Sequence, residues 1–138
     1  MFRAVMVFAF VTLVLGFGVT AHATFGDISL THPKMVSVPG QELTSFHVGQ
    51  QIGVESILTS HATSEKRFTY LVQVMNNKGQ IVYFEGLSAS ILPNQSFTVS
   101  QSWIPKESGL YTVQTFVWDS LMLPTPITDV IQTQVMVE

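Results

Sequence analysis

The residues that could do chemistry in this chain are few and scattered. The sequence contains no cysteine, which excludes disulfides, thiolate catalysis and sulfur-ligated metals. Beyond the N-terminal segment the histidines are His32, His47 and His61. None of them has a second His, Asp or Glu at a spacing that would place two ligands on one face. We therefore expect no metal site and no cofactor.

The arrangements used for hydrolysis are missing as well. The many serines include no G-x-S-x-G elbow between a strand and a helix, and no glycine-rich phosphate loop is present. General acid–base chemistry on a glycoside needs paired carboxylates. The glutamates of this chain stand singly, at Glu42, Glu55, Glu65, Glu85 and Glu107. The sequence indicates a protein that is not an enzyme.

One modification signal stands out. The triplet Asn94-Gln95-Ser96 is an acceptor pattern for N-glycosylation, and Pro93 before it indicates a turn. Such triplets also occur by chance, so Asn94 is either a glycosylated residue or part of an ordinary polar turn.

The N-terminus has the pattern of a secretory leader. Arg3 is followed by an apolar run from Ala4 to Val19 and then by Ala21-His22-Ala23, an A-x-A cleavage signature. We expect residues 1–23 to be a signal peptide, so that the mature chain is secreted and extracellular. The alternative is an uncleaved membrane anchor, although the run falls short of the ~20 residues that span a bilayer. Contact with a membrane is expected only through such an uncleaved leader.

Charge argues against nucleic acid as a partner. Six basic and nine acidic residues give a formal charge of −3, and Lys66-Arg67 is the only adjacent basic pair. A protein that binds phosphate backbones needs a basic stripe. With only 11% charged residues, the surface must be built largely from Ser, Thr, Gln and Asn.

The chain is organised around the stretch from Trp103 to Trp118. Pro105 cannot donate a ladder hydrogen bond, so the strand through Trp103 is expected to end there. Gly109 can supply the positive φ of a turn, and Leu110–Trp118 is rich in β-branched and aromatic residues, which predicts a second strand.

This stretch, Trp103-x-Pro105…Gly109-x-Tyr111-x-Val113, resembles the end of the immunoglobulin-like, CARDB-like β-sandwich modules of secreted bacterial and archaeal surface proteins. The resemblance covers roughly residues 46–138. It implies that Tyr111 forms a tyrosine corner, in which the hydroxyl bonds to nearby backbone. It implies a fold and almost nothing about function, because this architecture serves unrelated tasks.

Alternation and turn signals predict an all-β chain, namely a single seven-stranded antiparallel sandwich. Residues 24–45 form a lead-in with a short edge strand, and residues 46–138 form the sandwich domain. The expected core includes Ile52, Val72, Trp103, Tyr111, Val113 and Val135. The other strands are expected at 51–59, 68–75, 80–85, 97–103, 110–118 and 128–137, with a crossover at 88–95.

The outer face of the sheet that carries Tyr111 is the candidate functional surface. Parity places apolar side chains and glutamines there together, which is unusual for a solvent face. We predict a surface that binds a protein partner or a second copy, formed by Leu71, Gln73, Gln114, Phe116, Trp118, Gln132, Gln134 and Met136, with Met75 and Val130 beside them.

Alternatives to this interpretation stay open. A β-bulge could shift the register and return Phe116 and Trp118 to the core. The aromatic surface could stack on sugar rings, making the chain a carbohydrate-binding sandwich. The third alternative is an exported copper- or metal-binding protein. Small exported copper carriers with an Ig-like sandwich have a histidine at the mature N-terminus and another after the Tyr-bearing strand, and this sequence has neither.

Overall fold

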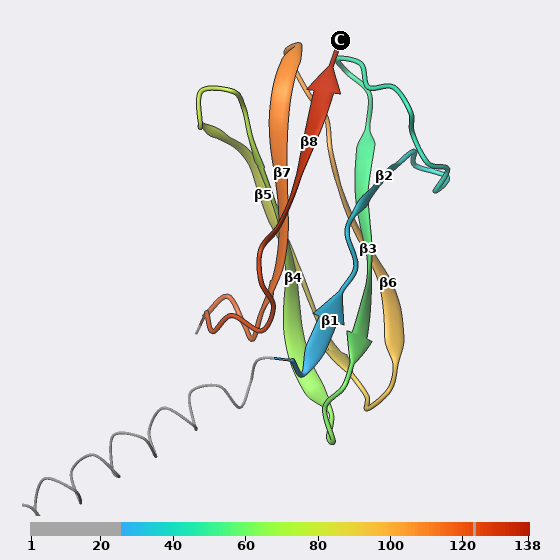
Figure 1. Cartoon of the computed structure of the whole chain (residues 1–138), viewed down its shortest axis with the longest axis vertical. Helices are drawn as coiled ribbons and strands as arrows, with labels where there is room; N and C mark the ends of the chain where they lie inside the picture. The colour runs from blue at the N-terminus through green and yellow to red at the C-terminus, as the bar shows by residue number, and fades with distance from the viewer. Residues whose placement is uncertain (1–25, 123) are drawn as a thin grey trace, which may run out of the picture.

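The computed structural model describes residues 26–122 and 124–138, which form a two-layer antiparallel β-sandwich without helices (Figure 1). The all-β prediction is confirmed, with eight strands in place of seven. They are β1 (Ile28–Leu30), β2 (Lys34–Val36), β3 (Ile52–Ser60), β4 (Lys66–Met75), β5 (Ile81–Ile91), β6 (Ser96–Trp103), β7 (Gly109–Trp118) and β8 (Ile131–Val137).

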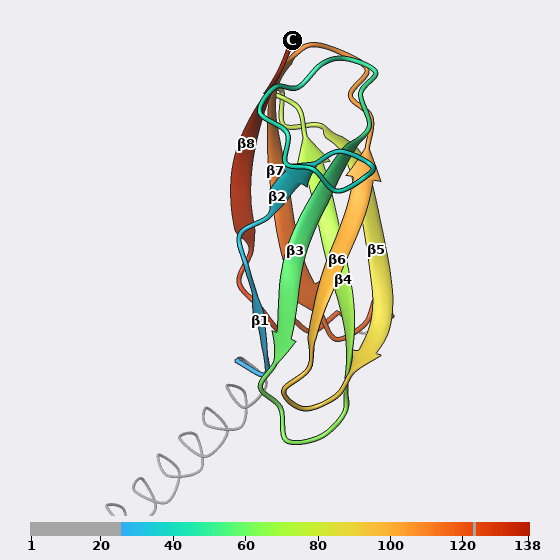
Figure 2. The same cartoon turned by 90° about the vertical axis from the view of Figure 1, so that its right-hand side faces the viewer.

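Each layer is one sheet. In the first sheet β3 pairs with β6 on one side and with both β1 and β2 on the other. The second sheet has the order β5-β4-β7-β8. Figure 2 shows β5 and β6 along the same open side of the sandwich. The described residues contain no helix that is long and apolar enough to cross a membrane. The predicted leader, residues 1–23, lies outside the described residues.

The extra strand comes from the N-terminal lead-in. Pro33 separates β1 from β2, because proline interrupts a ladder, and the two pieces pair with successive parts of β3. Ile28 and Met35 belong to the same buried cluster as the rest of the sandwich. The lead-in 24–45 and the domain 46–138 therefore share one core as far as the described residues extend.

β5 corrects one sequence prediction. A strand ending at Glu85 and a crossover from Ser88 were expected, whereas β5 continues unbroken to Ile91. Gly86 lies inside this continuous strand, where its neighbours on β4 approach closely. A Cβ placed there would lie 3.1 Å from the Leu71 and Thr69 side chains, so these two side chains would have to shift by a few tenths of an ångström to admit one.

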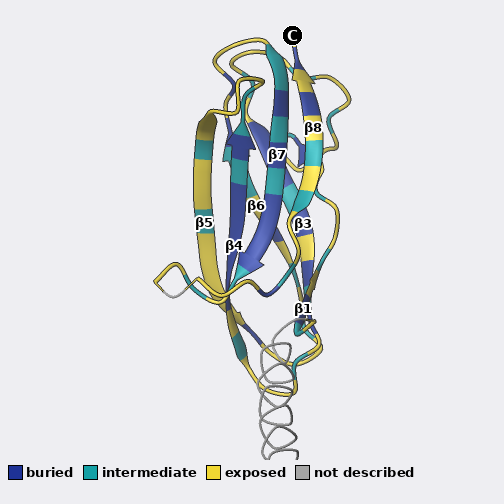
Figure 3. Ribbon diagram, turned by 60° about the vertical axis from the view of Figure 1, so that its left-hand side comes forward, coloured by how far each residue is buried: buried dark blue, intermediate teal, exposed yellow. Residues whose placement is uncertain are grey.

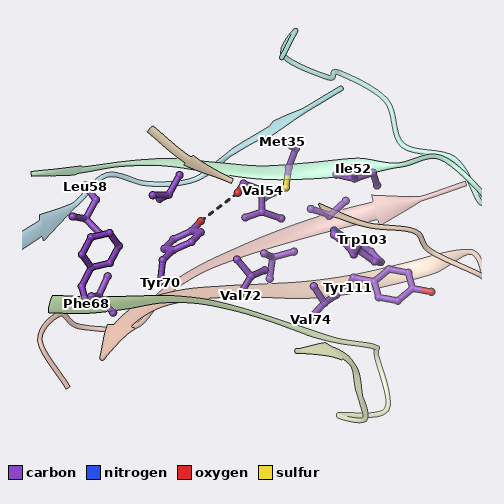
Figure 4. Packing of buried hydrophobic residues seen from close by; sticks show 14 of the residues in the cluster. Met35, Ile52, Val54, Leu58, Phe68, Tyr70, Val72, Val74, Trp103 and Tyr111 are labelled. Atoms are coloured by element: carbon purple, nitrogen blue, oxygen red, sulfur yellow. Dashed lines mark hydrogen bonds between the residues drawn. The ribbon is translucent and has the colours of Figure 1, made fainter. Parts of the chain in front are cut away.

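The core follows the predicted parity. Alternate residues of β3 and β4 face each other across the layers, as Figure 4 shows for Val54, Leu58, Phe68 and Val72. All six residues named above as the expected core are buried, each at most 5% exposed: Ile52, Val72, Trp103, Tyr111, Val113 and Val135.

The tyrosine corner is formed. The Tyr111 hydroxyl donates to the backbone oxygen of Glu107 at 2.7 Å, and Gly109, the first residue of β7, adopts φ 138° directly after the β6–β7 connection. The Trp103 and Tyr111 rings pack at a centroid distance of 5.0 Å. This corner fixes the connection between the two sheets.

A second polar link joins the sheets in the middle of the core. The Tyr70 hydroxyl, on β4, donates to the backbone oxygen of Val54 on β3 at 3.3 Å. It therefore accepts from the Ser56 hydroxyl, 3.0 Å away (Figure 4). Burial raises the pKa of Tyr70 to about 12, against a smaller opposing effect of the Ser56 hydrogen bond.

We expect Tyr70→Phe to destabilise the fold by about 1–3 kcal/mol, because it leaves the Ser56 hydroxyl and the Val54 carbonyl buried without their partner. Urea denaturation measures the change. Tyr83→Phe is the matched control: Tyr83 is partly exposed, so its change should stay within about 0.5 kcal/mol. Equal losses from both variants would contradict the inter-sheet link.

The pH dependence has a defined sign. An unfolded tyrosine ionises near pH 10, whereas Tyr70 stays neutral in the fold to about 12. As the pH rises from 10 to 12 the unfolded state alone loses this proton, so the free energy of unfolding falls by about 1.4 kcal/mol per pH unit from this group. In Tyr70→Phe, the free energy of unfolding measured by urea denaturation should fall less steeply with pH between pH 10 and 12 than in the wild type.

Candidate functional site

The predicted surface exists as the outer face of the β5-β4-β7-β8 sheet, which faces the viewer in Figure 3. Across β4 and β7, Leu71 pairs with Phe116 and Gln73 with Gln114. The only register shift in this sheet falls at Val74/Met75, between β4 and β5. No bulge therefore separates Phe116 from the outer face, and the predicted parity is confirmed.

A row of amides crosses the centre of this face. The Gln73 amide donates to Gln114 at 2.9 Å, and the Gln114 amide donates to Gln132 at 3.2 Å. These three residues occupy paired positions on β4, β7 and β8. Phe84 of β5 pairs with Gln73 and extends the row to the edge of the sheet. These two hydrogen bonds hold Gln73, Gln114 and Gln132 in line across the sheet.

Two members of the predicted surface are not available to a partner. Leu71 is fully buried and Phe116 is only 7% exposed, so their prediction as solvent-facing anchors is wrong. The loop after β7 folds back against this face, held by the backbone bond from Asp119 to Thr125. It brings Leu121 to 3.7 Å from the position of a Cβ on Gly86, beside Leu71. Figure 3 shows this loop crossing the end of β4 and β5.

Trp118 occupies the border of the covered region. Its ring lies 5.3 Å from that of Phe116, and the residue is partly exposed. The Trp118 ring therefore packs against the apolar residues under the loop and does not lie free on the surface. The predicted set is thus divided: Leu71, Phe116 and Trp118 form a small covered cluster, and the glutamines and Met136 form the accessible part.

Other apolar residues border the amide row, and sequence reasoning did not include them. Exposed on this face, on its loop or at its edges are Ile81, Phe84, Leu121 and Met122, together with Met136 and Val130 from the predicted set. Met122 is 90% exposed. The apolar run Ile81-Val82-Tyr83-Phe84 was a signal, but β5 was treated as an ordinary hairpin partner.

The two outer faces of the sandwich differ in character. On the second sheet, no charged residue occupies the outward positions of β7, of β8, or of β4 from Thr69 to Met75. On the first sheet the outward positions carry Glu55, paired with Lys34, and a series of hydroxyls from β3 and β6 that includes Ser96, Thr98, Ser100 and Ser102. Depletion of charge together with exposed apolar groups is typical of interface centres.

A groove lies at one end of the sandwich, between the β4–β5 turn and the β6–β7 connection. Its volume is about 380 Å³, within the usual range for small-ligand sites. Burial, with a smaller effect of Glu85, raises the pKa of Tyr83 in its wall. Aromatic, amide and charged side chains line it: Tyr83, Trp103, Tyr111, Asn76, Gln80, Lys106 and Glu107.

The candidate metal ligands stay apart. His61 bonds to the Ser29 hydroxyl at 3.0 Å, and His32 and His47 are exposed elsewhere. In the described residues no group of three or more His, Cys, Asp or Glu residues could hold a metal ion. Asn94 is exposed in its turn at φ 63°, which leaves its glycosylation a prediction.

Comparison with known proteins shows the fold and no more. No family model matches the chain, and no curated protein matches its sequence. Among solved structures, the C-terminal domain of wzt aligns with a TM-score of 0.69 and 13% identity, covering 82% of this chain and 74% of that one. A CARDB domain of the PF1109 protein from Pyrococcus furiosus, in complex with di-metal ions, aligns with a TM-score of 0.54 and 19% identity over 83% and 91%.

The fold is that of an Ig-like, CARDB-like β-sandwich module. A β-glucuronidase of glycoside hydrolase family 2 also aligns, with a TM-score of 0.61 and 15% identity, covering 76% of this chain. The aligned region is only 11% of that enzyme, so the likeness is to one β-sandwich-sized part of it.

Leu71 is expected to behave as a core residue although it lies on an outer face. Leu71→Ala should lower the free energy of unfolding by about 2–4 kcal/mol, because it leaves a cavity under Leu121. Met136→Ala, on the same face and 58% exposed, should change stability by no more than about 0.5 kcal/mol. Urea denaturation compares them, and a neutral Leu71→Ala would show that the loop does not cover this residue.

Proposed function

We propose that this chain is a non-catalytic, exported binding module that engages another protein at the cell surface through the outer face of its β5-β4-β7-β8 sheet. The amide row from Gln73 to Gln132 carries the proposal. Partnered glutamines flanked by Phe84 and Met136 offer hydrogen bonds and apolar area without the cost of desolvating a charge.

The division of the face suits such a role. The loop residue Leu121 covers Leu71, so the centre of the sheet is rigid and its apolar cluster adds stability. The exposed apolar residues lie around the ladder and remain accessible. A protein partner would bury them against its own apolar groups, while the amides pair with its backbone or polar side chains.

The exported location is part of the same proposal. It rests on the leader pattern of residues 1–23 and on a surface low in charge. None of these features names the partner, and the fold is shared by proteins with unrelated tasks.

The proposal is tested by photo-crosslinking in cells that produce the chain. A photoreactive amino acid at Gln134, which is exposed on the proposed face, should give a discrete protein adduct identified by mass spectrometry. The same group at Thr98, exposed on the outer face of the other sheet, is the matched control. Adducts at both positions alike, or at neither, would reject the face as a specific interface.

A second candidate is carbohydrate binding, favoured by the groove between the β4–β5 and β6–β7 connections. Tyr83 supplies a partly exposed ring, and Asn76 and Gln80 supply amides at the rim. Aromatic rings stack on the apolar faces of sugars, and amides bond to hydroxyls. In this version the sugar site is the groove, because the aromatic platform expected on the sheet face is largely covered.

Affinity gels with a broad panel of polysaccharides decide this second candidate. Retardation that is lost in Tyr83→Ala and kept in Tyr83→Phe would support stacking in the groove. Trp118→Ala, at the other end of the sandwich, is the control and should leave retardation unchanged. No retardation across the panel would reject carbohydrate binding.

A further inference from the structure

β5 is an unusually open edge. It is eleven residues long and pairs only with β4 among the strand pairings of the described residues. Of its side chains only that of Ile91 is buried, and Figure 3 shows the strand exposed along most of its length. Its outer edge therefore presents a row of backbone donors and acceptors that no strand satisfies.

The edge has few of the features that usually prevent pairing. Natural edge strands are kept short, or carry proline, lysine or an inward charge. β5 contains no proline and no basic residue; its single charge, Glu85, pairs with the core residue Val72 and so lies on the inner side, and a register shift at Val74/Met75 interrupts the ladder near the start of the strand. The apolar residues Ile81, Val82, Phe84 and Leu87 are all at least 40% exposed.

The other edges of the sandwich are better protected. β1 and β2 have three residues each, with Pro33 between them. β6 is rich in serine and threonine and ends just before Pro105. β8 has seven residues. Among the edge strands of the described residues, β5 is thus the longest and exposes the most apolar side chains.

We propose that β5 pairs antiparallel with β5 of a second copy of this chain, about a two-fold axis at Gly86, which makes one continuous eight-stranded sheet. A two-fold axis at Gly86 pairs Tyr83 with Ala89 of the second copy, so the regular stretch of β5 from residue 83 to residue 89, beyond the register shift, finds partners throughout. Antiparallel pairing of one strand with itself is the closed, isologous contact expected of a homodimer. This inference concerns the sheet edge and does not depend on which protein binds the sheet face.

The sequence of β5 is self-complementary in this register. Glu85 lies opposite Leu87 of the second copy, whereas a two-fold axis one residue earlier would place the two Glu85 carboxylates opposite each other, which is unfavourable. On the outer face Phe84 lies opposite Ser88, diagonal to the second copy's Gly86, which leaves space for the ring. Charge is low overall, at −3 for the chain, so repulsion between copies is weak.

The loop after β7 lies next to the middle of β5. Leu121 lies over Gly86, and Met122, the next residue, is 90% exposed. A second β5 paired at this edge would pass beside these side chains and reduce their exposure. An apolar loop end next to an unpaired apolar edge is consistent with a surface that is covered in the assembled protein.

The first test is the mass of the purified full chain by light scattering at micromolar concentrations, which should be that of a dimer. Phe84→Lys with Ser88→Lys places two lysines directly opposite each other on both sides of the axis and should weaken dimerisation about tenfold or more. Gln134→Lys with Met136→Lys on β8 is the matched control and should leave the dimer intact. A monomeric wild type, or a dimer lost only through the β8 changes, would overturn the proposal.

The second test reads the register and uses the absence of native cysteine. Phe84→Cys with Ser88→Cys should give a covalent dimer on mild oxidation, since residue 84 of one copy lies opposite residue 88 of the other. Within one strand these positions are too far apart to bond. Phe84→Cys alone should stay uncrosslinked, and circular dichroism checks that each variant folds. Cross-linking by the single variant as efficient as by the double variant would reject the register.

Discussion

The hydrogen bonds between Tyr70 and β3 help to determine how the two sheets align, and the positions of the other strands depend on that alignment. A sandwich without cysteine has no covalent bond between its layers, so the separation and alignment of the sheets depend on packing and on the few polar groups that cross the core. The Tyr70 hydroxyl reaches from β4 to Ser56 and Val54. Because its polar atoms are paired in a low-dielectric interior, this link favours one alignment of β3 against β4 over its neighbours.

Because side chains alternate between the two faces of a strand, the residues that face the core determine which residues face outward. The outer faces of the two sheets differ in composition. The first sheet presents hydroxyls and a Lys34–Glu55 pairing, as expected for a surface that meets water. The second sheet presents an amide ladder bordered by apolar groups. The loop carrying Leu121 buries part of that apolar surface within the chain itself. The accessible remainder is uncharged, with the glutamines held to one another by hydrogen bonds.

Sequence reasoning succeeded where a two-residue period decides the outcome and failed where the path of the backbone decides it. Alternation was sufficient to assign Ile52, Val72 and Val113 to the core and Gln73 and Gln114 to an outer face. It could not show that the loop after Trp118 folds back and covers Leu71, because loop paths leave no periodic trace. The end of β5 was predicted too early for a related reason: Gly86 in the sequence is compatible with a turn and with a close approach inside a strand, and only the neighbouring β4 distinguishes the two.

The edge and the face belong to the same structural element. Phe84 continues the amide row on the outer face, while the backbone of the same strand is unpaired along its outer side. A contact made through the backbone of β5 leaves the outward side chains of β4, β7 and β8 free. Pairing of two copies would thus extend the ladder face across both and present it twice to a partner. Two weak contacts made by one dimer bind more tightly than either contact alone.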